Sequence, residues 1–91
     1  MEDIAKIDYE LTSEYYVNTQ WCKSINKAIS YINFDEINDF LTRYNMNRNI
    51  KEELFDLIDM AERVQGPITE VRKQGIMVYK RNGNWKIEII I

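Results

Sequence analysis

The chain ends in a pattern typical of a β-hairpin, IMVYKRNGNWKIEIII at residues 76–91. Asn82 and Gly83 separate two arms of alternating apolar residues, which is a strong local signal for a two-residue type I′ turn. With these two residues as the loop, Val78 faces Ile87 on the side of the hairpin that we assign to the core. A hairpin of this kind cannot fold alone, so it requires another layer to cover its apolar face.

The tip of the hairpin is basic and aromatic, although the whole chain has a net charge of −3. The register places Lys80 opposite Trp85 on the core face and Tyr79 opposite Lys86 on the other face. Each pair is a cross-strand cation–π contact, worth about 0.5–1 kcal/mol when exposed. The tip therefore either stabilises its own hairpin or binds a partner. As a candidate partner- or nucleic-acid-binding site it comprises Tyr79, Lys80, Arg81, Trp85 and Lys86.

Gly66-Pro67 divides a helical front from a strand-rich back. Glycine suits the left-handed position after a helix, and proline cannot continue one. Before this point, Asn49 is a candidate N-cap with Glu52 at the third helical position, as in a capping box. An apolar stripe at helical spacing follows it: Ile50, Leu54, Leu57, Ile58, Ala61 and Val64.

Two more helices are predicted upstream. Asn33 and Glu36 form a second capping box, and the stripe that follows is Ile37, Phe40, Leu41 and Tyr44. The earliest helix is predicted from a stripe that begins at a tryptophan: Trp21, Ile25, Ala28, Ile29 and Ile32.

The remaining segments complete the expected architecture. Residues 1–17 fit either a strand or a short helix that docks on the rest, and residues 68–73 fit a third strand, with Gln74-Gly75 as its turn. We therefore predict one α+β domain over residues 1–91. It consists of three helices followed by a C-terminal antiparallel hairpin or a three-stranded meander, and the IEIII end of the last strand is an edge through which two copies could pair.

Cysteine content and hydropathy limit where such a chain works. Cys22 is the one cysteine, so no internal disulfide can form, which fits a reducing compartment, and we expect it to be a small core residue. No stretch approaches the ~18–20 apolar residues that a membrane helix needs. The first residues, MEDIAKIDYE, are acidic where a signal peptide is basic. We expect a cytoplasmic protein without a membrane partner.

Catalysis is disfavoured by the residues that are missing. The chain has no histidine, which removes the commonest general base and metal ligand. The three glycines all stand at predicted turns, so no phosphate loop or dinucleotide fingerprint occurs. We expect no catalytic residues, no metal site and no cofactor.

Charge is divided unevenly along the chain. Residues 1–66 carry 13 acidic and 7 basic residues, a net of −6, whereas residues 67–91 carry 2 acidic and 5 basic residues, a net of +3. Such a layout bears on partners and association rates. Carboxylates on the polar faces of the second and third helices form the first candidate partner-binding surface, with a solvated helix face as the alternative. These are Asp35, Glu36, Asp39, Glu52, Asp56 and Asp59.

The order of three short helices and a hairpin over residues 20–91 resembles the winged-helix DNA-binding domain. The resemblance implies a helix–turn–helix at residues 33–66, a wing at residues 75–90 and a nucleic-acid-binding regulator. It departs from the family in the recognition helix, which offers Glu52, Asp56 and Asp59 where such proteins present basic and amide side chains to DNA.

We expect instead a non-catalytic protein-binding module. Small acidic proteins rich in Asn and Ile resemble phage-encoded inhibitors of host proteins, including anti-CRISPR proteins, which place carboxylates where a nuclease expects phosphates. The resemblance is one of composition, and it implies a host protein as partner, in particular a nucleic-acid-processing enzyme. The winged-helix regulator is the alternative.

Overall fold

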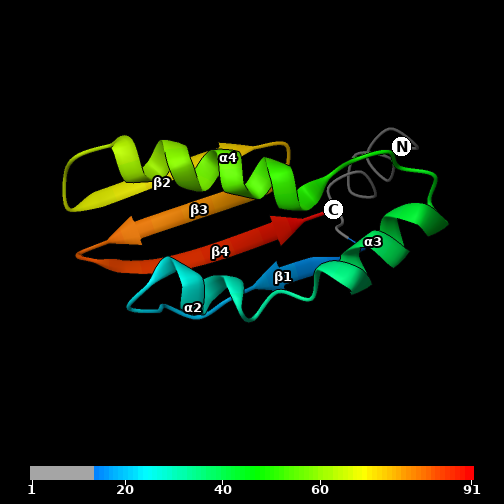
Figure 1. Cartoon of the computed structure of the whole chain (residues 1–91), viewed down its shortest axis with the longest axis horizontal. Helices are drawn as coiled ribbons and strands as arrows, with labels where there is room; N and C mark the ends of the chain where they lie inside the picture. Colours follow the sequence, from blue (N-terminus) through cyan, green and yellow to red (C-terminus); the bar gives the residue numbers. More distant parts are fainter. Residues whose placement is uncertain (1–13) are drawn as a thin grey trace, which may run out of the picture.

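The computed structural model describes residues 14–91, which form three helices and four strands (Figure 1). The predicted α+β class is confirmed, with the difference that one strand precedes the helices. Of the prediction for residues 1–17, the part before residue 14 lies outside the described range. The elements are β1 (Tyr16–Asn18), α2 (Ile25–Ile29), α3 (Phe34–Arg43), α4 (Ile50–Arg63), β2 (Ile68–Lys73), β3 (Ile76–Arg81) and β4 (Asn84–Ile90).

The predicted hairpin is the centre of the sheet. The strands are antiparallel, in the order β1-β4-β3-β2. β3 and β4 pair in the predicted register, with Val78 opposite Ile87. Asn82 and Gly83 have φ angles of 49° and 84°, as a type I′ turn requires. Because β3 and β4 have neighbours on both sides, the hairpin does not project from the domain as a wing.

A second turn of the same kind joins β2 to β3, which confirms the predicted third strand. Gln74 and Gly75 have φ angles of 49° and 85°. The N–H of Ile90 donates to the carbonyl oxygen of Gly75 at 2.7 Å. The two backbones lie so close here that a Cβ at Gly75 would collide with the carbonyl oxygen of Ile90.

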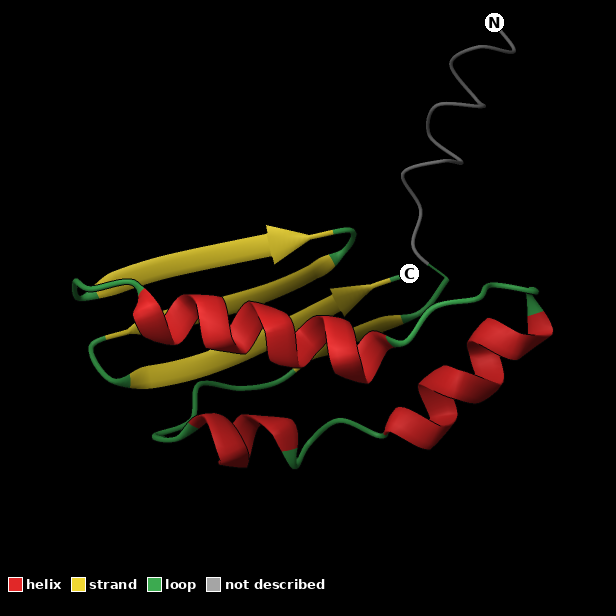
Figure 2. Ribbon diagram, turned by 45° about the horizontal axis from the view of Figure 1, so that its top comes forward, coloured by secondary structure: helices red, strands yellow, loops and turns green. Residues whose placement is uncertain are grey.

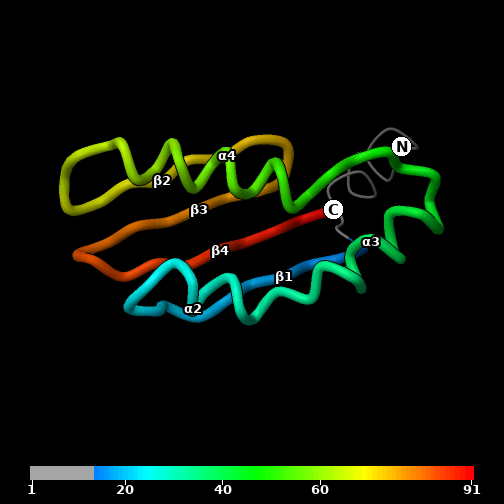
Figure 3. The backbone as a smooth tube through the Cα atoms, viewed as in Figure 1, coloured from blue at the N-terminus to red at the C-terminus, as the bar shows by residue number. Residues whose placement is uncertain are grey.

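β1 lies along the other side of β4, so the first described strand runs beside the last one (Figure 3). Tyr16 pairs with Ile90, and beyond β1 the hydroxyl of Thr19 accepts a hydrogen bond from the N–H of Ile87 at 2.8 Å. The expectation of a free edge at the C-terminal strand, and of a homodimer through it, is therefore wrong. β1 already occupies that edge.

The helices gather on one side of the sheet (Figure 2). α4 packs on β2 and β3, α2 packs on β4, and α3 contacts α4. No helix within residues 14–91 is long and apolar enough to cross a membrane. Each fully buried aliphatic side chain between these layers contributes about 1.5–3 kcal/mol. The core between helices and sheet includes Ala28, Ile37, Leu41, Ile50, Leu54, Leu57, Ile58, Ala61, Ile76, Val78, Ile87 and Ile89.

The earliest helix is shorter than predicted. A helical turn at Trp21 is wrong, because the backbone of Cys22 is extended and pairs with Trp85: the N–H of Cys22 donates to the carbonyl oxygen of Trp85 at 2.8 Å. α2 begins only after Ser24, whose hydroxyl accepts from the N–H of Lys27 at 3.1 Å. Cys22 is buried, as expected, and its thiol donates to the carbonyl oxygen of Gln20.

The two turn glycines provide a matched test of this packing. Gly75 and Gly83 share almost the same positive φ, but space is open around Gly83. We expect Gly83→Ala to lower the free energy of unfolding by about 1 kcal/mol through backbone strain alone. Gly75→Ala should lower it by about 2 kcal/mol or more, because the collision with Ile90 adds to the same strain. Urea denaturation measures both, and equal losses would contradict the close approach.

Candidate functional site

The carboxylates of the first candidate surface all lie exposed on the helical side: Asp35, Glu36, Asp39, Glu52, Asp56 and Asp59. Asp59 forms an ion pair with Arg63, which lies one helical turn further along at 2.8 Å. Bases also interrupt the surface. The ammonium of Lys51 lies 5.7 Å from the ring of Phe34, where the first turns of α3 and α4 meet. The helical side is therefore acidic on balance, without being a continuous anionic patch.

Two of these acidic residues contribute their backbone N–H groups to helix caps. The side chain of Asn33 accepts from the N–H of Glu36 at 3.1 Å, and Asn49 accepts from the N–H of Glu52 at the same distance. Acidic residues in a first turn also complement the helix dipole, by about 0.3–1 kcal/mol each. Among the described residues, no group of three or more acidic or cysteine side chains could hold a metal ion. The first-turn positions of Asp35, Glu36 and Glu52 account for half of this acidic pattern.

The sheet divides the predicted hairpin-tip site between its two faces. Lys80 and Trp85 face each other on the helical side, as the register predicted, with the ammonium 5.5 Å from the ring centroid. Tyr79, Arg81 and Lys86 lie on the opposite face, which no described helix covers. The five residues therefore do not form one site.

Lys80 has a structural partner on the helical side. Its ammonium donates to the carbonyl oxygens of Ala61 and Val64, at 3.2 and 3.1 Å. These carbonyls belong to the last turn of α4, where the helix leaves acceptors without helical partners and where a cation opposes the dipole. Lys80 thus caps α4 and ties it to β3.

Trp21 joins the residues of the uncovered face. Because Cys22 pairs with Trp85, Trp21 lies beside Lys86, which in turn lies beside Tyr79. The ring of Trp21 meets the ring of Tyr79 edge-on, with centroids 6.4 Å apart. It is still 41% exposed. We call Trp21, Tyr79, Arg81 and Lys86 the aromatic–basic cluster.

Two cations lie over the rings of this cluster. The ammonium of Lys86 lies 5.3 Å from the ring centroids of both Trp21 and Tyr79. The guanidinium of Arg81 lies 5.2 Å from Trp21. Neither cation takes part in an ion pair among the residues that the structure describes. Their charges are therefore held in place by the rings and remain available to a partner.

The carboxylate of Glu88 organises the neighbouring part of the same face. It accepts from the hydroxyl of Tyr16 at 2.5 Å and from the hydroxyl of Tyr79 at 2.8 Å. The bond from Tyr16, followed by the one from Tyr79, lowers the pKa of Glu88 against a smaller opposing effect of burial. Burial and then the contact with Glu88 raise the pKa of Tyr79 to about 12. Glu88 is thus held ionised and Tyr79 neutral.

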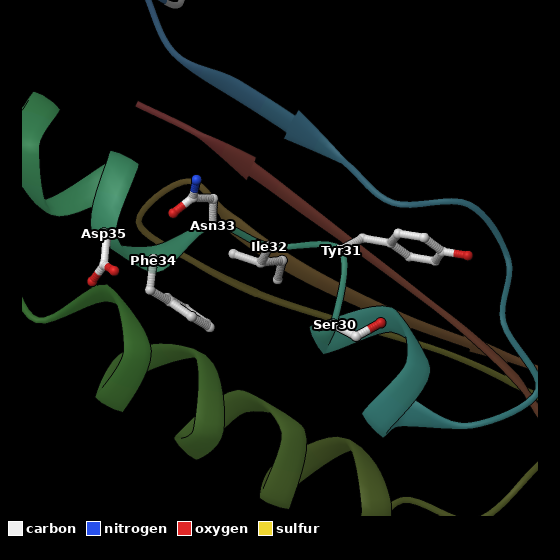
Figure 4. A pocket seen from close by; sticks show the side chains of 6 residues that line it. All are labelled: Ser30, Tyr31, Ile32, Asn33, Phe34 and Asp35. Carbon is white, nitrogen blue, oxygen red and sulfur yellow. The ribbon is translucent and has the colours of Figure 1, made fainter.

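A shallow depression of about 460 Å³ lies between α2 and α3, lined by residues 30–35 (Figure 4). Tyr31 and Asp35 stand at its two ends, and Phe34 points toward α4. Consecutive linker residues line it without convergent polar groups, so we assign it no ligand.

Sequence reasoning missed Trp21 as a surface residue. The spacing of Trp21 to Ile25 favoured a helix, whereas the segment YVNTQW is extended. A strand signal is present in the alternation of Val17 and Thr19, which turn inward, with exposed neighbours. This alternation covers too few residues to outweigh the helical spacing of Trp21 and Ile25.

The hydrogen bond from Tyr79 to Glu88 predicts that the stability of the folded protein depends on pH. Since the pKa of Glu88 is lowered in the folded state, its contribution to stability is present above the ordinary value of 4.5 and is lost as the pH falls through the lowered pKa. Tyr79→Phe should raise the pKa of Glu88 and cost about 1 kcal/mol at neutral pH, and less in acid. NMR titration of the Glu88 carboxyl carbon measures the shift. Tyr31→Phe is the control, and an unchanged Glu88 titration in Tyr79→Phe would contradict the contact.

No family model, curated protein or solved structure matches this chain. Its function is therefore inferred from the geometry of its two sides: an acidic helical side, and an uncovered sheet face that carries the aromatic–basic cluster.

Proposed function

We propose that the protein is a non-catalytic protein-binding module that inhibits or modulates its partner, and that it docks through the uncovered face of its sheet. The observation that carries this proposal is the aromatic–basic cluster. It places an exposed tryptophan, a tyrosine and an arginine side by side, with 6.4 Å between the two ring centroids and 5.2 Å between the guanidinium and the tryptophan ring. Trp, Tyr and Arg are the residues that most often dominate binding energy in protein interfaces.

The surroundings of the cluster support a protein partner. Met77 lies beside Tyr79 in the next row of the same face, and Ile90 and Tyr16 lie exposed beyond it. Apolar and aromatic groups with few free charges are typical of the centre of an interface. The sheet is also a rigid support, so little conformational entropy is lost on docking.

The acidic helical side supports this function less well than the sheet face does. Glu36 and Glu52 lie in the capped first turns of α3 and α4, Asp59 is paired, and Lys51 and Arg63 lie among the carboxylates. We retain this side as a second contact surface for a basic region of the partner.

The class of partner that we propose follows from the composition of the chain. We propose a cytoplasmic setting and a host protein as the target of a phage or mobile-element product, in particular a nucleic-acid-processing enzyme. The lone buried thiol and the acidic, Asn- and Ile-rich composition support this part of the proposal.

Single-stranded nucleic acid is the second candidate ligand, because bases stack on aromatic rings and phosphates bind arginine and lysine. Two observations weigh against it. Lys86 already lies over the rings of both Trp21 and Tyr79, at 5.3 Å from each centroid. The cations of the face, Arg72, Arg81 and Lys86, are nearly balanced by Glu70 and Glu88, whereas nucleic-acid surfaces are strongly basic.

Two aromatic residues of similar exposure allow a matched test of the docking face. Trp21 is 41% exposed on the sheet face, and Phe55 is 43% exposed on α4. Tagged protein should capture a set of proteins from a bacterial lysate, quantified by mass spectrometry. We expect Trp21→Ala, alone or with Arg81→Ala, to reduce this capture at least about tenfold, which corresponds to about 1.4 kcal/mol, while Phe55→Ala retains it.

A third variant tests the helical side. Replacing Glu52, Asp56 and Asp59 by lysine should weaken capture less than Trp21→Ala does. If the triple lysine variant weakens capture more than Trp21→Ala does, the docking surface lies on the helices instead. Capture no greater than that of an unrelated tagged protein, at any salt concentration, would refute the binding function.

Nucleic-acid binding has its own test. Fluorescence anisotropy with a single-stranded oligonucleotide at about 50 mM salt should show no saturable binding. Binding that weakens as salt rises, and that is lost when Arg81 and Lys86 are replaced by glutamate, would favour the nucleic-acid reading.

A further inference from the structure

Within residues 14–91, the outer edge of β2 is open along its whole length. β2 pairs with β3 on one side, and no described segment pairs with its other side. In Figure 2 it is the outermost strand of the sheet. The opposite edge strand, β1, has only 3 residues, whereas β2 has 6. Natural proteins usually protect edges of this length with bulges or prolines, because unpaired backbone groups attract another strand.

The backbone direction along β2 follows from one hydrogen bond. The N–H of Asn82 donates to the carbonyl oxygen of Pro67 at 2.8 Å, in line with the β2–β3 register. Because backbone groups alternate along a strand, every second residue from Pro67 bonds to β3. The residues between them, Ile68, Glu70 and Arg72, direct their N–H and C=O groups toward the open edge.

Glu70 and Arg72 form an ion pair with each other within the chain, and a second copy of this edge could exchange that pair for two pairs between chains. If a second strand with the same sequence ran antiparallel to β2 with Val71 facing its own copy, Glu70 would lie opposite the partner's Arg72 and Arg72 opposite the partner's Glu70. Both pairs would fall on the uncovered face, and each would exchange two backbone hydrogen bonds. If the second strand shifts by two residues in either direction, Glu70 faces its own copy or Arg72 faces its own copy, and these like charges repel each other. One register is therefore favoured.

Apolar surface on both faces of β2 agrees with this pairing. Ile68 is 67% exposed on the uncovered face. Val71 on the helical face is half-buried, although Val78 beside it is fully buried. A paired strand would cover part of each side chain.

We infer that two copies of this chain pair through β2 about a two-fold axis at Val71, which joins their sheets into one continuous sheet. The axis is perpendicular to the sheet, so both uncovered faces lie on the same side, with both aromatic–basic clusters. The contact is isologous, since each copy uses the same edge. The dimer is independent of the proposed function, because it forms without any other partner.

Charge reversal tests the register. Sedimentation velocity over a roughly hundredfold range of concentration should show a reversible dimer, because the interface is at the small end of stable contacts. Glu70→Arg and Arg72→Glu should each abolish it, since like charges then face each other, and the double variant should restore it. Glu62→Arg, a reversal on the exposed side of α4, is the matched control and should leave the dimer unchanged.

A disulfide provides a second test that does not depend on charge. In the inferred register, Val71 and its copy form a non-hydrogen-bonded pair, with Cα atoms about 4.5 Å apart, which suits a disulfide. Val71→Cys should crosslink the dimer under mild oxidation, and Glu70→Cys, which does not face itself, should not; the native Cys22 is buried and should not interfere. Each of three results would overturn the inference. The first is a monomer at every concentration, the second is a dimer that both single charge reversals leave intact, and the third is a double variant that stays monomeric.

Discussion

The pairing of β3 with β4 is the constraint on which the rest of the structure depends. The Asn82-Gly83 turn admits one register, and a slip by one residue would exchange the two faces of both strands. This register turns Val78 and Ile87 toward the helices, where both are fully buried. It also turns Tyr79 and Lys86 to the opposite face. The division between the core and the uncovered face is therefore set by a two-residue turn.

The parts of the fold that local rules specify could be predicted from the sequence. The hairpin register, the N-caps Asn33 and Asn49, and the apolar stripe of α4 all rest on interactions within a few residues along the chain. β1 could not be predicted in the same way. Its partner lies some seventy residues away, so the pairing of Tyr16 with Ile90 leaves almost no local trace.

The candidate site shows the same division between residues that local rules place and residues that only the tertiary fold brings together. Charge and hairpin register indicated Tyr79, Arg81 and Lys86, because those residues lie on one predicted element. Trp21 comes from another part of the chain and reaches the cluster only through the bridge between Cys22 and Trp85. Lys80 was grouped with the tip by sequence proximity, but its contact with the end of α4 depends on how the helix packs across the sheet. The alternation of side chains along the strands places sequence neighbours on opposite faces of the sheet. The tertiary fold brings residues that are distant in sequence together.

The single thiol lies at the junction of these two parts. Cys22 lies next to Trp21 in the chain, its side chain is buried, and its backbone bonds to β4. Because only 6% of Cys22 is exposed, a thiol reagent reacts with it faster when this segment separates from the sheet or when the whole chain unfolds. The rate at which the native protein is alkylated is therefore an intrinsic measure of how often the Trp21 side of the surface opens, without any added label.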